Sequence, residues 1–398
     1  MDFGIFDADQ HYYEAEDCLS RYASKRMQAT KAVRWLTEGD GKRRRLAIAD
    51  RITTVIGNPT FDPIVKPGAF HETLKSLQAG EDRTTTAAAY GELVPIDPCY
   101  RDRDVRLKRM DEQGVERALL FPTLGVTLEG YADHDPELLY DLMHAFNRWL
   151  EDDWGYSYRD RLIAVPMLSF ADPDAAVEEV ERLIERGARI VHVRPAPVPG
   201  PNGTGRSLGD KAHDPVWARL AEASIPVAFH LGDSGYNRFA ASWGGSGTFE
   251  GFGKTDVLSK ILVSDRAIHD TIASLVIHGV FKRHPTLRVA SIENGSDWMH
   301  VLVKRLRKQA NQTPWVFPED PGDTVRAHVW VTPYCEEDFQ ALAELIGVER
   351  ILFGSDWPHG EGLAQPMDFE KELSGFGEDD VRRIMRDNCV ELLGGKAA

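Results

Sequence analysis

Residues 3–11 read Phe-Gly-Ile-Phe-Asp-Ala-Asp-Gln-His, an apolar run that ends in an acidic and an imidazole side chain two positions apart. Short apolar runs of this kind recur along the chain, and longer segments of helical period separate them. This alternation is typical of βα units on a parallel sheet. Eight runs have the length of strands, and they occupy residues 3–8, 117–121, 162–166, 190–193, 226–229, 286–292, 328–331 and 351–354.

Eight βα units are the number that closes a (β/α)₈ TIM barrel, so we expect an α/β fold of that architecture. A doubly wound open sheet is the competing α/β arrangement. It generally contains fewer strands, and its dinucleotide-binding versions carry Gly-x-Gly-x-x-Gly after the first strand, a motif that does not follow residues 3–8. The number of strands therefore favours the barrel.

Residues 28–100 interrupt the rhythm of strands and helices. Two strand-like runs, 32–36 and 45–56, flank a Gly-Asp-Gly turn at 39–41, which predicts a hairpin. We interpret 28–100 as a cap or hairpin insertion over the mouth of the barrel, within a single domain that spans 1–398. A second irregular stretch, 231–255, contains seven glycines and predicts a long functional loop.

Composition and charge exclude several classes of protein. Of the 398 residues, 42% are hydrophobic and 28% charged, as in a globular protein with a sizeable core. The net charge of −16 disfavours nucleic-acid binding, which needs basic patches against phosphates. No apolar run approaches the about 18 residues of a membrane span, and the N-terminus does not have the pattern of a signal peptide. We therefore expect a cytoplasmic protein that acts on a small molecule.

Polar side chains follow several of the predicted strands. Asp9 and His11 end the first, His230 ends the fifth and Asp356 follows the eighth. The carboxyl ends of barrel strands meet at one face, where active sites lie. Burying carboxylates and imidazoles together is costly unless a cation compensates them, and both are ligands for zinc and manganese. We predict one divalent metal ion, Zn²⁺ or Mn²⁺, bound by Asp9, His11, His230 and Asp356.

Further side chains at the same face are candidates for catalysis and substrate binding. The candidate catalytic residues are Asp356, Glu293 and His230. The candidate substrate-binding residues are Arg194, Tyr12, Tyr13 and His359. A guanidinium such as that of Arg194 matches the geometry of a substrate carboxylate, and tyrosine rings can form walls for a flat substrate.

Five segments resemble the amidohydrolase-related family, the branch of the amidohydrolase superfamily that contains aminocarboxymuconate-semialdehyde decarboxylase and the aromatic-acid decarboxylases. These segments are residues 7–11, 106–114, 229–230, 279–285 and 352–359. The Phe-Gly-Ser-Asp-Trp-Pro-His run at 353–359 is the most specific of them. The resemblance follows the order of the chain from residue 5 to about 392, with 28–100 as an interruption.

The resemblance implies a barrel with a single metal ion, assembled as a homodimer or larger. The first family motif is His-x-His or Glu-x-His, and Asp9-x-His11 is nearer to the acidic variant. His230 and Asp356 match the family's histidine after strand 5 and aspartate after strand 8. Many relatives carry a catalytic histidine after strand 6, where this chain has Glu293. A carboxylate would then transfer the proton at that place, or Glu293 would touch the metal.

The resemblance favours a non-oxidative decarboxylase, a carboxy-lyase acting on an aromatic or unsaturated carboxylic acid, with Asp356 delivering a proton to the carbon that loses CO₂. The alternative is a metal-dependent hydrolase, in which a metal-bound water attacks an ester, lactone, amide or C–C bond. A third hypothesis, a non-catalytic ligand-binding barrel, fits less well with the enclosed pocket that the cap and the glycine-rich loops predict.

Overall fold

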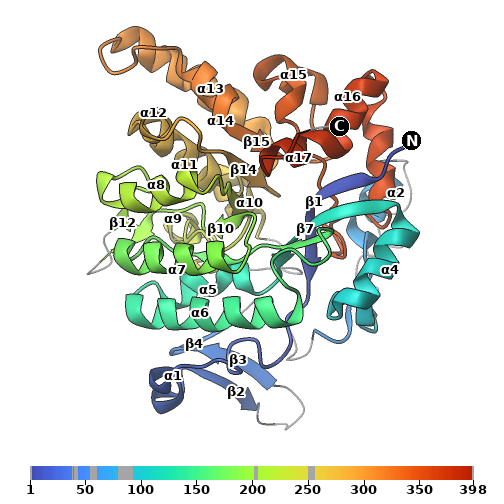
Figure 1. Ribbon diagram of the computed structural model, residues 1–398, viewed down its shortest axis with the longest axis vertical. Helices are drawn as coiled ribbons and strands as arrows, with labels where there is room; N and C mark the ends of the chain where they lie inside the picture. Colours follow the sequence, from blue (N-terminus) through green and yellow to red (C-terminus); the bar gives the residue numbers. More distant parts are fainter. Residues whose placement is uncertain are drawn as a thin grey trace.

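The computed structural model describes residues 2–37, 39, 44–53, 61–78, 93–200, 205–249 and 256–396. Parallel strands lie inside, and helices α6, α7, α8 and α12 follow one another along one side of the molecule (Figure 1). The fold is therefore α/β with parallel strands, as the alternation of runs predicts. In the described part of the chain, every helix is too short or too polar to cross a lipid bilayer.

Two parallel sheets form the interior. The first has the strand order β1-β7-β8, and the second has the order β15-β14-β13-β10-β9. The bounds of these strands are β1 Ile5–Tyr12, β7 Val115–Pro122, β8 Leu162–Ala164, β9 Met167–Leu168, β10 Val191–Val193, β13 Val227–His230, β14 Val289–Ile292 and β15 Val329–Val331. All of them except β9 overlap one of the first seven runs expected from the sequence; β9 begins one residue after the third run, which ends at Pro166.

The two sheets are joined between β8 and β9. Proline has no N–H to donate, so Pro166 interrupts a strand that would otherwise run through both elements. On one side of the interruption, the N–H of Val165 donates to the carbonyl of Leu120 at 3.0 Å. On the other side, the carbonyl of Pro166 accepts from the N–H of His192 at 2.8 Å. The third predicted strand thus bridges β7 and β10.

The sheets also meet through residues 351–354, the eighth predicted run. The N–H of Leu352 donates to the carbonyl of Val331 at 2.8 Å, which extends the second sheet beyond β15. The N–H of Ala8 donates to the carbonyl of Phe353 at 2.9 Å, which links the same segment to β1. The carboxyl ends of β1 and of 351–354 therefore lie side by side.

A cluster of fully or nearly fully buried side chains connects strands of both sheets. It contains Phe6, Ala8, Leu119, Phe121, Ile163, Val165, Ile190, Ala228, Ala290, Ile292, Trp330 and Leu352, together with residues of the C-terminal helix. In most strands these are alternate residues, because successive side chains point to opposite faces. The helices pack a larger apolar cluster against the other faces.

The helices begin at residues suited to the start of a helix. Aspartate side chains accept N–H groups of the first turn in several of them, including Asp172 before α7, as the sequence predicts. The helices between and after the strands are α4 Arg103–Gln113, α5 Leu128–Ala132, α6 Pro136–Asp153, α7 Pro173–Glu185, α8 Asp214–Glu222, α9 Asn237–Ala241, α10 Val257–Val263, α11 Arg266–Ile277, α12 Val280–Arg283, α13 Asp297–Gln312, α14 Pro321–His328, α15 Phe339–Ile346, α16 Glu378–Arg382 and α17 Asn388–Leu392.

The first half of the predicted insertion contains an antiparallel sheet. Strands β2 Val33–Thr37, β3 Arg44–Ile48 and β4 Arg51–Ile52 lie beside helix α1, Lys25–Thr30, at one end of the molecule (Figure 1). Most of the expected turn at 39–41 lies outside the described residues. Arg51 donates from Nη1 to the carbonyl of Gly130 at 2.7 Å, so this sheet rests on α5.

The second half of the insertion contacts the loop after residues 351–354. It contains β5 Ile64–Val65, α2 Ala69–Gln78 and β6 Leu93–Val94. The N–H groups of Gly68 and Phe70 donate to the carbonyls of His359 and Gly360 at 3.1 and 2.7 Å. The start of α2 is therefore fixed directly to the segment that carries His359.

Candidate metal centre

Asp9 and His11 lie at the carboxyl end of β1, two residues apart on one face of the strand. The buried carboxylate of Asp7, just before them, accepts from the N–H of Ser355 at 2.9 Å and from the side chain of Gln10 at 2.9 Å. Burial raises the pKa of Asp7 to about 7 against the lowering effect of these hydrogen bonds. Asp7 therefore fastens β1 to the segment that contains Asp356.

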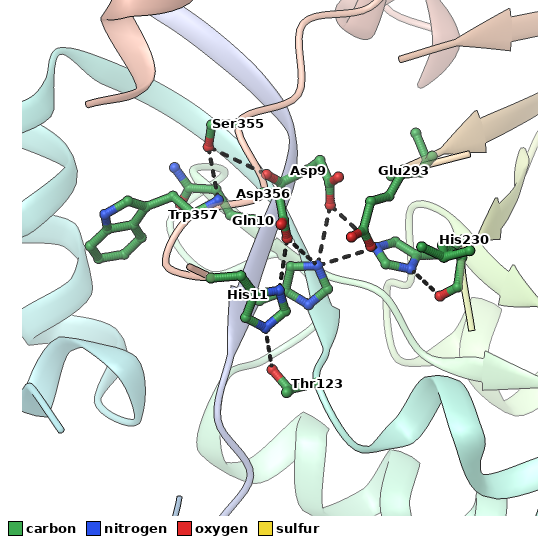
Figure 2. A network of polar contacts seen from close by, with 12 residues as sticks. Asp9, Gln10, His11, Thr123, His230, Glu293, Ser355, Asp356 and Trp357 are labelled. Atoms are coloured by element: carbon green, nitrogen blue, oxygen red, sulfur yellow. Dashed lines mark hydrogen bonds and ion pairs between the residues drawn. The ribbon is translucent and has the colours of Figure 1, made fainter. Parts of the chain in front are cut away.

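Four side chains from three strand ends converge on one point (Figure 2). His230 Nε2 lies 3.1 Å from His11 Nε2, 3.3 Å from Asp9 Oδ1 and 3.4 Å from Glu293 Oε2. One possible ligand atom from each of Asp9, His11, His230 and Glu293 lies within 4.8 Å of the others. His11 Nε2 is also 3.3 Å from Asp356 Oδ1. The predicted ligands are thus neighbours in space.

The hydrogen bonding of His230 indicates that a cation belongs between its Nε2 atom and the neighbouring carboxylates. Its Nδ1 lies 2.7 Å from the carbonyl of Leu231, which can only accept, so Nδ1 carries the proton. In the neutral ring Nε2 then presents a lone pair to carboxylate oxygens of Asp9 and Glu293, which present lone pairs as well. A cation at this point turns these repulsive contacts into coordination, and the set of donors fits zinc or manganese.

Burial and crowding of carboxylates shift the pKa values in this region. Burial, followed by the neighbouring carboxylates, holds the pKa of Glu293 and that of Asp356 well above the usual range. Burial also lowers the pKa of His11. Asp9 is the exception: burial opposes its ionisation, but the neighbouring imidazoles, His11 first and then His230, bring its pKa down to about 2. The cluster is rich in acidic groups and poor in positive charge.

Asp356 is held on both its main chain and its side chain. Its φ is +55°, and its N–H donates to the carbonyl of Asp9 at 2.8 Å. Its Oδ1 lies 2.7 Å from Nδ1 of His359, and Nε2 of His359 lies 3.0 Å from Oγ1 of Thr123. His359 is 3% exposed and its ring is 4.0 Å from that of His11. Both nitrogens of His359 therefore face protein groups, behind Asp356.

The two tyrosines predicted to bind substrate differ in their distance from this cluster. Tyr13 is 6% exposed and its ring lies 5.8 Å from that of His359. Tyr12 is fully buried between Trp149 and Trp154, on the face of β1 opposite to His11. This corrects the expectation for Tyr12, because successive side chains of a strand point to opposite faces.

Arg194 follows β10 and is largely buried. Its Nε donates to the carbonyl of Asp233, and its Nη2 lies 3.9 Å from Oδ1 of the same residue. Glu129 on α5 is also near: burial raises the pKa of this carboxyl group to about 7, while the charge of Arg194 lowers it. Two acidic residues thus surround the guanidinium that we expect to bind a substrate anion.

Glu361 is an acidic residue of the cluster that the sequence analysis did not predict. Oxygens of Glu361, Glu293 and Asp356 lie within 4.8 Å of one another. Glu361 lies between Gly360 and Gly362, five residues after Asp356, in a loop without any period. An acidic residue between two glycines shortly after the last strand is the signal that could have identified it.

Comparisons with known proteins agree with the motifs. The sequence model of the amidohydrolase family matches residues 97–395. A curated relative, 2-amino-3-carboxymuconate-6-semialdehyde decarboxylase of Dictyostelium discoideum, is 22% identical over 307 residues, covering 75% of this chain and 78% of its own. The crystal structure of an amidohydrolase from Mycobacterium avium subsp. paratuberculosis K-10 is 49% identical, with a TM-score of 0.91, and covers 100% of this chain and 99% of its own.

A more distant structure shares the fold. It is a dihydroxybenzoic acid decarboxylase from Polaromonas sp. JS666, with bound manganese and the inhibitor 2-nitroresorcinol. It is 16% identical, with a TM-score of 0.59, and covers 98% of this chain and 97% of its own. The family expected from the sequence motifs is confirmed: the chain belongs to the amidohydrolase family.

Proposed function

We propose that this protein is a metal-dependent carboxy-lyase that removes CO₂ from an aromatic or unsaturated carboxylic acid. The observation that carries the proposal is the meeting of His11 Nε2 and His230 Nε2, 3.1 Å apart, among carboxylate oxygens. The decarboxylase activities of the Dictyostelium and Polaromonas relatives support the type of reaction.

Asp9, His11, His230 and Asp356 would hold one divalent ion, with Glu293 as a further ligand or an acid–base group. Glu293 groups directly with Asp9, His11 and His230, whereas Asp356 approaches this group through His11 Nε2 at 3.3 Å and through Glu293. We propose Mn²⁺ rather than Zn²⁺, because carboxylates outnumber imidazoles there and the Polaromonas enzyme binds manganese. When bound, the ion supplies the positive charge that attracts the substrate carboxylate and an adjacent oxygen.

Asp356 is the proposed proton donor. The hydroxyl of Thr123 donates to the carbonyl of Tyr12 at 2.8 Å, so its oxygen accepts from Nε2–H of His359. Nδ1 of a neutral His359 then accepts a proton held on Asp356 Oδ1, 2.7 Å away. Burial first and then Glu293 raise the pKa of Asp356, and a bound cation would oppose this shift, so the hydrogen bond to His359 carries the assignment.

In the reaction, Asp356 gives this proton to the carbon that bears the carboxylate, and a C–H bond forms. The bond from that carbon to the carboxylate then breaks, its electron pair returns to the substrate, and CO₂ leaves. Asp9, His11, His230 and Asp356 are buried, which limits the access of water that would compete for the proton.

We also propose that the eight strand segments close a barrel, which the hydrogen bonds of Ala8 to Phe353 and of Leu352 to Val331 support. Residues 28–100 would cover its mouth, as the bond from Phe70 to Gly360 indicates. The substrate contacts of Arg194 and Tyr13, the homodimer and the cytoplasmic location stay predictions.

The test is to supply purified protein with Mn²⁺ or Zn²⁺ and a panel of hydroxybenzoic acids, and to measure released CO₂ and the decarboxylated product. We expect CO₂ release that stops when a chelator removes the metal and returns with Mn²⁺. Hydrolysis of neutral esters without any release of CO₂ would contradict the proposal and favour a metal-dependent hydrolase.

A further inference from the structure

Glu293 has an unusual main-chain conformation for a residue with a side chain. Its φ is +57°, in the left-handed region that favours glycine, and it follows directly after β14. A residue with a Cβ keeps this conformation only where its surroundings hold it, and such residues cluster at functional sites. The contacts of the Glu293 main chain therefore decide where its carboxylate points.

Two hydroxyl groups hold this main chain, one at each polar atom. The N–H of Glu293 donates to Oγ1 of Thr332 at 2.9 Å, and its carbonyl accepts from the hydroxyl of Tyr334 at 2.6 Å. Both hydroxyls belong to the segment after β15, where the N–H of Thr332 also donates to the carbonyl of Ser291 at 3.0 Å. One neighbouring segment thus clamps residue 293 from both sides.

Tyr334 is itself well anchored. Its N–H donates to Oε2 of Glu337 at 3.0 Å, and the Glu337 carboxylate also accepts from the N–H of Ser296 at 2.8 Å. The Tyr334 ring lies against Gly295, where a Cβ would come within 2.8 Å of a ring carbon. Tyr334 is 43% exposed, so loss of its hydroxyl opens no cavity in the core.

We propose that the hydroxyls of Tyr334 and Thr332 are positioning groups that hold Glu293 so that its carboxylate faces His230, 3.4 Å away. The inference rests on the proposed function, because it gives Glu293 a role only within the metal centre. Tyr334 and Thr332 act through Glu293, and neither is a catalytic residue.

The test is a double-mutant cycle of Tyr334→Phe and Glu293→Gln in the whole protein, with Mn²⁺ affinity measured by calorimetry beside kcat and KM for CO₂ release. Phenylalanine keeps the ring against Gly295 and removes only the hydroxyl. We expect Tyr334→Phe to weaken Mn²⁺ binding about 5-fold and to lower kcat about 10-fold, with KM changed less than about 2-fold. In the Glu293→Gln protein, the same substitution should change nothing further.

A second pair of variants checks the other hydroxyl. Thr332→Val removes it and should reproduce the effects of Tyr334→Phe, whereas Thr332→Ser keeps it and should restore both Mn²⁺ affinity and kcat. Tyr158→Phe is the matched control, because it removes a tyrosine hydroxyl that bonds to Asp104 at 2.8 Å, away from the cluster.

Three results overturn the inference: no effect of Tyr334→Phe, an equal effect in the Glu293→Gln protein, or a change in KM alone, which would make Tyr334 a substrate contact. A wild-type protein that binds Mn²⁺ but releases no CO₂ refutes the carboxy-lyase, while the Mn²⁺ cycle still decides the role of Tyr334. A wild-type protein that binds no Mn²⁺ refutes both.

Discussion

The turn after β14 and the turn after residues 351–354 place carboxylates at the same cluster by different means. Glu293 and Asp356 both have positive φ, and burial raises the pKa of both. Asp356 is bonded through its carboxylate to His359 at 2.7 Å. Glu293 is bonded through its main chain, and its carboxylate approaches His230 at 3.4 Å.

This difference suits Asp356 to proton transfer and Glu293 to metal binding. A carboxyl group with a short bond to an imidazole, itself fixed by Thr123, is suited to hold and release a proton at a defined atom. A carboxylate fixed through its backbone is suited to contribute charge at a defined place. Substitutions in the two turns should therefore differ in size and kind.

The largest effect is expected for Asp356→Asn. The amide keeps the shape of the side chain but cannot donate a proton as an acid, and it is a weaker metal ligand. We expect kcat to fall about 10³-fold, within the usual contribution of a general acid. Rapid-quench measurement of product formation at saturating Mn²⁺ checks this, and a loss below tenfold would assign the proton to another group.

Glu293→Gln should have a smaller effect. Glutamine keeps the left-handed turn and its two main-chain hydrogen bonds but replaces the carboxyl group near His230 with an amide, which is a weaker metal ligand. We expect kcat to fall about 30-fold and Mn²⁺ to bind less tightly, since the side chain touches the cluster without carrying the transferred proton. A loss equal to that of Asp356→Asn would erase the distinction between the two turns.

Thr123→Val tests the support behind Asp356. The isosteric change removes the oxygen that lies 3.0 Å from His359 Nε2. We expect kcat to fall about 5-fold with unchanged Mn²⁺ affinity, because the buried imidazole loses the partner that fixes its tautomer. Thr123→Ser should retain wild-type rates, and an unaltered kcat in the valine variant would show that the tautomer needs no such support.

Glu179→Gln is a control distant from both turns. The carboxylate pairs with Arg182 at 2.8 Å and with His144 at 3.2 Å. Burial raises its pKa, but these partners bring it down from the usual 4.5 of a glutamate to about 2. Because the folded pKa is the lower one, the carboxylate stabilises the native state above about pH 4.5, and this contribution disappears as the pH falls towards about 2.

We expect Glu179→Gln to cost on the order of 2 kcal/mol in the free energy of unfolding at pH 7, with kcat unchanged. Denaturant titrations at pH 7 and below pH 4.5 measure this, and the difference from wild type should shrink in the acid. A constant difference across that range would mean that the lost contact is not ionic.

The strand ends could be predicted because a simple rule governs them. Asp9 and His11 share a face of β1 since alternate side chains of a strand do, and parallel strands bring His230 and Asp356 to the same edge. The same rule, applied to Tyr12, places it on the opposite face, where the structure has it packed between tryptophans.

The loops could not be predicted in this way. Glu361, Thr332 and Tyr334 lie in segments without a period, and their partners are far away in the sequence or separated by a turn. Their positions depend on the backbone angles of a few residues, such as the φ of +57° at Glu293, which composition does not reveal.

The hydrogen bonds of Gly68 and Phe70 to His359 and Gly360 connect the N-terminal end of α2 to the loop that carries the proposed proton donor, Asp356. A displacement of α2 would therefore shift the loop at Gly360, four residues after Asp356. Substitutions in this helix, which lies outside the cluster, can consequently change the position of the Asp356 carboxyl group and the rate of proton transfer without replacing any reacting group.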